Sequence, residues 1–128
     1  MSYNKYQQTS VESAGREKLL LMLYEGAIKF VKRAIIATES NDIPARCENI
    51  GKAYDIVMEL MNTLDFKVGG EVAENLEQLY MFITDELTRA NITGKVDHLN
   101  SVLKILNTLH SGWKEAIELV KKNEAKGA

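Results

Sequence analysis

Apolar residues recur along most of the chain at alternating spacings of three and four, which is the pattern of amphipathic α-helices. The segment after residue 42 follows it without a polar exception at Ile43, Cys47, Ile50, Tyr54, Val57, Met61 and Leu64. The next segment follows it at Ala73, Leu76, Tyr80, Ile83, Leu87 and Ala90. Nothing in the sequence alternates with period two, so we expect helices and no strands.

The first and last apolar segments complete a set of four. The first contains Leu20, Tyr24, Ala27, Val31 and Ala34. The last contains Val96, Leu99, Leu103, Leu106, His110, Trp113, Ile117 and Val120. Turn-forming residues separate the segments at 40–42, 68–70 and 91–94. The predicted helices therefore cover about 16–39, 43–65, 70–91 and 95–122.

Long helices joined by connections of only a few residues must run antiparallel to their neighbours. The sequence therefore predicts an all-α fold, an antiparallel up-down-up-down four-helix bundle with near-parallel packing. Asn41 or Asp42 suits the N-cap of the second helix, with Pro44 in its first turn, where the missing N–H costs nothing. Gly94 can close the third helix.

The length of 128 residues suits a single domain over 1–128, which can hold a core without metals or disulfides. We expect residues 1–13 to form a short N-terminal arm that caps the bundle, and residues 123–128 to form a mobile tail. The net charge of −2 lacks the basic surplus of nucleic-acid binders.

Several features point to the cytosol. The N-terminus lacks the apolar stretch of a secretory signal, and the longest apolar run, residues 19–24, is far shorter than the ~20 residues of a membrane-spanning helix. Cys47 is the only cysteine, which is compatible with a reducing compartment. We therefore expect a cytosolic protein without membrane insertion.

Motifs that carry chemistry are missing from the sequence. Lys95 precedes His98 by three residues and Asn107 precedes His110 by three, so neither histidine belongs to the Glu-x-x-His pair of di-iron bundles. HExxH, CxxCH and phosphate-binding glycine loops are also absent. We expect no catalytic residues, no metal, no cofactor and no small-molecule substrate.

His110 keeps a second class of function open, a helical-bundle histidine phosphotransfer or cofactor-binding domain. That histidine would be exposed and followed by a lysine, whereas here Lys114 comes one residue late and His110 lies in an apolar seam. A partly buried structural histidine is the preferred interpretation. Haem ligation by Met22 and His110 is disfavoured because Met22 falls on a polar side. We expect His98 to be solvated, and Cys47 to act as a small apolar residue in its seam.

The helices carry more apolar residues than their seams need. Those of the first helix spread over roughly 200° of arc, whereas a core-facing stripe needs little more than ~100°. Other helices extend beyond their seams at Ala53, Ile56, Leu60, Leu79, Phe82, Val102, Ile105 and Leu109. Either each helix needs a broad face to touch two neighbours, or part of the surplus forms an exposed groove for a partner. Tyr3 and Tyr6 either dock on the bundle as a cap or are exposed aromatics.

Several segments, in this order, resemble the flagellar secretion chaperone family FliS, and the resemblance covers nearly the whole chain. They are residues 21–28 (LMLYEGAI), 64–73 (LDFKVGGEVA), 75–80 (NLEQLY), 90–91 (AN) and 113–116 (WKEA). The tyrosine pair Tyr3 and Tyr6 matches as well. The family usually has a Ser-Pro pair before the first helix, where this chain has Gly15-Arg16, and this difference leaves the start of the first helix open.

The resemblance implies a cytosolic export chaperone that works without ATP and is not an enzyme. It would bind the disordered C-terminal segment of flagellin, prevent premature polymerisation, and deliver flagellin to the type III flagellar export gate, one component of which would be a further partner. Together with the apolar surplus, it suggests these partner-binding residues: Tyr3, Tyr6, Leu23, Tyr24, Ile28, Ile50, Tyr54 and Val57. Just outside the seams, Ile56, Leu60 and Phe82 are expected to be exposed.

Overall fold

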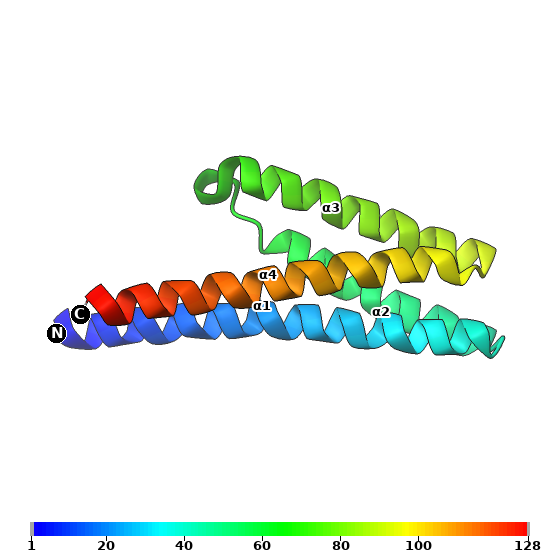
Figure 1. The fold of residues 1–128 in the computed structure, drawn as a ribbon, viewed down its shortest axis with the longest axis horizontal. Coiled ribbons are helices and arrows are strands. Elements are labelled where there is room, and N and C mark those ends of the chain that lie inside the picture. The colour runs from blue at the N-terminus through cyan, green and yellow to red at the C-terminus, as the bar shows by residue number, and fades with distance from the viewer. Residues whose placement is uncertain (1, 128) are drawn as a thin grey trace.

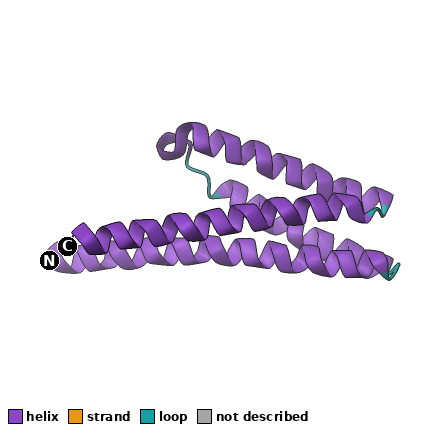
Figure 2. Ribbon diagram, in the orientation of Figure 1, coloured by secondary structure: helices purple, strands orange, loops and turns teal. Residues whose placement is uncertain are grey.

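The computed structural model describes the backbone of residues 2–127 and the side chains of residues 15–126. It contains four helices, α1 (Ser2–Glu39), α2 (Ile43–Asn62), α3 (Phe66–Thr93) and α4 (Val96–Gly127), and no strand within the described backbone. The predicted all-α four-helix bundle is confirmed. The chain reverses direction at each of its three loops (Figures 1 and 2).

Each helix packs against two neighbours, so the four helices form a closed ring. α1 and α3 each contact both α2 and α4. The long helices α1 and α4 lie side by side, whereas the first turns of α3, in green, stand away from them (Figure 1). Because every helix serves two interfaces, much of the broad apolar surface of each helix is needed for the core.

Several helix boundaries differ from the predicted ones. α1 begins at Ser2 rather than near residue 16, and α4 continues to Gly127, beyond the predicted end at 122. The predicted break at 68–70 is a kink inside α3, where Gly70 has a φ of 49°. The loop lies earlier because Asp65 caps α3: its carboxylate accepts hydrogen bonds from the backbone N–H of Lys67 at 3.0 Å and of Val68 at 3.1 Å.

The other predicted caps are confirmed. Of the two candidates for the N-cap of α2, the structure selects Asp42, whose side chain accepts a hydrogen bond from the N–H of Ala45 at 3.2 Å, and Pro44 lies in the first turn. Gly94 ends α3 in the left-handed conformation with a φ of 68°, and its N–H donates to the carbonyl of Ala90.

The core confirms one predicted seam completely and corrects another. All six seam residues of α3 are buried. In α2 the buried residues are Ile50, Ala53, Val57 and Leu60. Ile43, Cys47 and Tyr54 are exposed instead, because α2 is rotated toward α1 relative to the predicted seam. The predicted face and the buried face of α2 are both apolar, and Ile50 and Val57 belong to both. The spacing of apolar residues alone therefore did not show which face is buried.

Candidate functional site

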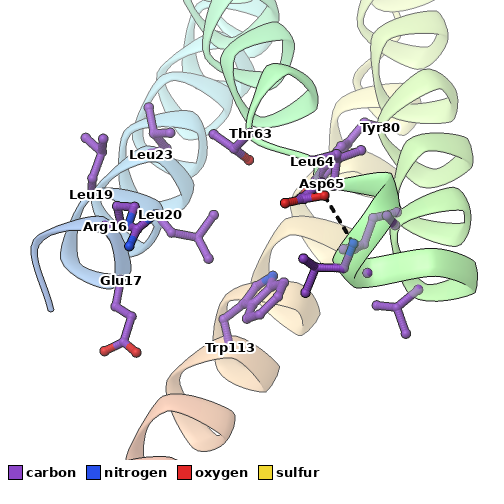
Figure 3. Close-up of a pocket in the computed structure, with 15 residues that line it drawn as sticks. Arg16, Glu17, Leu19, Leu20, Leu23, Thr63, Leu64, Asp65, Tyr80 and Trp113 are labelled. Carbon is purple, nitrogen blue, oxygen red and sulfur yellow. Dashed lines mark hydrogen bonds between the residues drawn. The ribbon is translucent and has the colours of Figure 1, made fainter. Parts of the chain in front are cut away.

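An apolar cleft of about 560 Å³ opens between the N-terminal half of α1, the α2–α3 loop, the first turns of α3 and one indole of α4. Its apolar lining consists of Leu19, Leu20, Leu23, Leu64, Val68, Val72, Ala73, Leu76 and Trp113, together with the ring of Tyr80. In the close-up the leucines of α1 face Leu64 and Tyr80 across the cleft, with Trp113 below them (Figure 3).

The cleft follows from the way α3 begins. Asp65 starts the helix immediately after the loop, and the positive φ of Gly70 then bends it, a conformation that glycine adopts without steric cost. The turn before the kink therefore does not continue the line of the helix. A side chain at Gly69 would meet Ala73, since an added Cβ would lie 3.0 Å from the Cβ of Ala73. The two glycines thus allow the start of α3 to fold back beside the cleft.

Two walls of the cleft expose large apolar side chains to solvent. Leu19 of α1 is 54 % exposed and Val72 of α3 is 61 % exposed. Charged groups lie at the edge, where Arg16, Glu17 and Asp65 contribute both signs of charge. An apolar surface of this kind with a polar rim is typical of a site for the apolar face of a peptide or helix.

Three hydrogen-bonded side chains from three helices lie beneath the cleft. The indole Nε1 of Trp113 donates to the hydroxyl of Tyr24 at 3.1 Å, and the hydroxyls of Tyr24 and Tyr80 are hydrogen-bonded to each other. Both tyrosines are buried. Burial raises the pKa of each phenol above its ordinary value, so both remain neutral at physiological pH. The bond between the two tyrosines joins α1 to α3, which lie diagonally opposite each other in the bundle.

The predicted partner-binding residues lie in different parts of the structure. Leu23 lines the cleft, and Tyr24 lies beneath it through its hydroxyl. Ile28 is half-buried against the core, and Tyr54 is 37 % exposed on a flank of α2 outside the cleft. Ile50 and Val57 are core residues, as is the ring of Tyr24, so in this structure these three side chains present no exposed surface to a partner. Tyr3 and Tyr6 belong to α1, but their side chains lie outside the described residues.

Two of the three expected surface residues also need correction. Leu60 is fully buried, because it belongs to the true seam of α2. Ile56 is half-buried at the interface with α1, where its Cδ1 lies 3.2 Å from the position that a Cβ added to Gly26 would occupy. Phe82 is exposed as expected.

The histidines and the cysteine give mixed outcomes. His110 is confirmed as partly buried: its ring packs beside Tyr24, and Nε2 lies 3.3 Å from the carboxylate of Glu25 without hydrogen-bond alignment. This placement gives no support to a phosphotransfer histidine. His98 is not simply solvated, since Nδ1 lies 2.7 Å from Oε2 of the buried Glu86. Cys47 is not a seam residue; it is exposed, and its thiol donates to Oδ1 of Asn91 at 3.1 Å.

Sequence reasoning missed most of the cleft lining. Leu19, Val68 and Val72 occupy no seam position, and the glycine pair between the two valines was interpreted as a loop. One signal in the sequence was available. Val68 and Val72 lie on either side of the glycine pair, and a solvent-exposed loop does not need apolar residues there. Within the described residues the structure holds no cluster of potential metal ligands. None of the helices, over the same residues, is long and apolar enough to cross a membrane.

Comparison with known proteins gives consistent matches over almost the full length. The family model described as flagellar protein FliS matches residues 1–120. A flagellar secretion chaperone FliS from Campylobacter jejuni is 36 % identical over 115 residues, covering 90 % of each chain. The protein of that name from Vibrio cholerae is 34 % identical over 116 residues, covering 88 % of this chain and 85 % of the other. The one from Bacillus subtilis is 34 % identical over 121 residues, covering 94 % and 90 %.

Proposed function

Because the chain belongs to the FliS family and is thus a flagellar export chaperone rather than an enzyme, we propose that it binds the disordered C-terminal segment of flagellin in the apolar cleft. The bound segment would be kept from premature polymerisation in the cytosol. The chaperone would then deliver flagellin to a component of the type III flagellar export gate. The observation that carries the assignment of the site is the open apolar cleft between α1 and the start of α3.

The cleft suits an amphipathic helix that forms on binding. Its volume lies within the ~300–1,000 Å³ range of ordinary ligand sites, and its walls offer aliphatic side chains rather than directed polar groups. Such walls accept several apolar side chains from one face of a helix, typically spaced three or four residues apart. Charged residues of both signs lie at the rim, beside the polar face of such a helix, which stays in contact with water.

Apolar residues on α3 extend the surface beyond the cleft. Val72, Leu79 and Phe82 are spaced by seven and three residues, which places them along one flank of the helix, and all three are exposed. A disordered segment can therefore follow α3 away from the cleft and bury apolar surface along it. Part of the gross interaction energy is lost to ordering the segment, and this loss keeps release at the export gate feasible.

Titration of the protein with a synthetic peptide of the last few dozen residues of flagellin tests the proposal. Calorimetry should give a binding heat at micromolar concentrations, and circular dichroism should show that the mixture contains more helix than the sum of its parts. The helix gain is expected because the apolar cleft offers no water to the backbone of the bound peptide. The N–H and C=O groups of the peptide must therefore form hydrogen bonds with each other, as they do in a helix. Absence of both signals at tens of micromolar would contradict the proposal.

A further inference from the structure

Three cationic side chains surround the ring of Phe30 on the surface between α1 and α2. The Nζ of Lys29 lies 4.7 Å from the ring centre, the Cζ of Arg33 lies 5.7 Å from it, and the Nζ of Lys52 lies 5.3 Å from it. The three cationic residues are exposed, whereas Phe30 is half-buried and packs against the core. We call these four residues the Phe30 cluster. None of them lines the apolar cleft, so the cluster is a separate surface and does not depend on the proposed function.

The cluster carries more positive charge than its surroundings neutralise. Lys52 pairs with Glu48 on the same helix at 3.2 Å, and both side chains are largely exposed. Among the side chains that the structure describes, no carboxylate forms an ion pair with Lys29 or Arg33. The ring attracts cations to its electron-rich face, but it does not remove their mutual repulsion. The described part of this surface therefore leaves two adjacent positive charges without an anion.

The charge of the whole chain limits which anion suits the cluster. Acidic residues outnumber basic ones and the net charge is −2, so the rest of the surface repels a long polyanion such as nucleic acid. It also repels an anionic membrane, which is usually bound by about four to eight clustered cations. A single small anion gains too little, because one exposed ion pair changes an affinity by at most about fivefold. The ligand that fits is therefore short and carries several carboxylates on one chain.

We infer that the Phe30 cluster is a docking surface for an acidic segment of a partner protein. Lys29 and Arg33 are four residues apart on α1, which separates them by about 6 Å along the helix axis. Glutamates four positions apart on a helical ligand have the same separation, so two of them match the two cations that lack an anion. The contacts with the ring of Phe30 hold the cations together before the ligand arrives, and this preorganisation lowers the cost of binding.

The test titrates the full-length protein with an alanine-based peptide of about twelve residues that has glutamate at every fourth position. Fluorescence anisotropy at about 10 mM salt, where charges are screened little, should show saturable binding, and the same peptide with glutamine should not bind. The double variant Lys29→Gln/Arg33→Gln should bind at least about fivefold more weakly. Lys104→Gln/Lys114→Gln is the matched control. It removes two exposed lysines of α4, changes the net charge equally, and should weaken binding by less than about twofold.

A second measurement locates the acidic peptide on the wild-type protein and needs no variant. The backbone amide resonances of residues 29–33 and 48–52 should shift when the peptide is added. Equal weakening in the two double variants, shifts confined to the apolar cleft, or no binding at about 1 mM peptide would overturn the inference. Vesicles of phosphatidylserine and phosphatidylcholine are the remaining comparison. If the protein binds them through Lys29 and Arg33 but ignores the peptide, the cluster serves a membrane surface and the inference is wrong.

Discussion

The imidazole Nδ1 of His98 lies 2.7 Å from the carboxylate Oε2 of Glu86 and joins the first turn of α4 to α3. The side chain of Glu86 is 9 % exposed, and its Oε1 also lies 3.5 Å from Nη1 of Arg89. His98→Ala leaves this carboxylate without its best partner, so we expect the free energy of unfolding to fall by ~1–3 kcal/mol. Urea unfolding measures it. Ser101→Ala, on an exposed face of α4, should change stability by less than ~0.5 kcal/mol. Equal stability of the two variants would contradict the structural role of the pair.

Gly94 at the end of α3 should not tolerate a side chain. Its φ of 68° is a conformation that costs other residues ~1–2 kcal/mol, and an added Cβ would lie 2.9 Å from Nη1 of Arg46. Arg46 would have to move, although its Nη2 donates to the carbonyl of Asn91 at 3.2 Å. We expect Gly94→Ala to lower stability by at least ~1 kcal/mol in denaturant unfolding.

The control for Gly94 is a glycine inside a helix. Gly51 of α2 is exposed, and an added Cβ there would have no neighbouring atom within 4 Å. Gly51→Ala should therefore raise stability by ~0.5–1 kcal/mol, because alanine loses less conformational freedom than glycine in a helix. Opposite signs for the two substitutions are the expected result. A stabilising Gly94→Ala would show that α3 does not end as the structure has it.

Stability should fall at alkaline pH because of the paired tyrosines. Burial raises the pKa of both Tyr24 and Tyr80 above the ordinary value of 10.0. The folded protein then holds two phenolic protons that the unfolded chain releases above about pH 10, so unfolding becomes more favourable as pH rises through that value. Absorbance at 295 nm should show that two of the five tyrosines ionise only when far-UV circular dichroism reports unfolding. Ionisation of all five while the helices remain intact would contradict the burial of the pair.

Removal of residues 1–12 tests the predicted N-terminal cap. If Tyr3 and Tyr6 occupy apolar surface that the ligand also uses, the shortened protein should stay folded, bind more of the dye ANS, and differ from the full-length chain in its affinity for the flagellin peptide. Unchanged dye fluorescence together with unchanged affinity would mean that the two tyrosines do not cover that surface.

Helix number and type were predictable because the spacing of apolar residues carries that information directly. The seam of α3 was predicted completely, even though Leu79 and Phe82 extend its apolar surface on one flank. The seam of α2 was not, since Ala53 and Leu60 on one flank compete with Tyr54 and Met61 on the other. Only the positions of α1 and α3 decide which flank is buried, and a single helix does not carry that information.

The cleft was less predictable than the fold. Leu23 was among the predicted partner-binding residues and lines the cleft, but the contribution of Trp113 depends on contact across 89 residues of sequence. The early start of α3 depends on a capping bond of Asp65, and a glycine pair normally indicates a loop. Local sequence therefore favoured a break where the structure has a capped and kinked helix, and the cleft that this geometry opens was missed.

The central claim, that the cleft is the flagellin site, is tested most directly by one pair of variants on α1. Leu19 lines the cleft and is 54 % exposed, whereas Ile36 lies near the other end of α1 and is 64 % exposed. Both side chains are largely solvent-exposed, so replacing either one by aspartate should change the free energy of unfolding of the protein by no more than ~0.5 kcal/mol. Thermal unfolding of the two variants checks this. Calorimetric titration with the flagellin C-terminal peptide should then show that Leu19→Asp loses ~2 kcal/mol or more, a complex at least ~30-fold weaker, while Ile36→Asp binds like the wild-type protein. Equal affinities of the two folded variants would contradict the account.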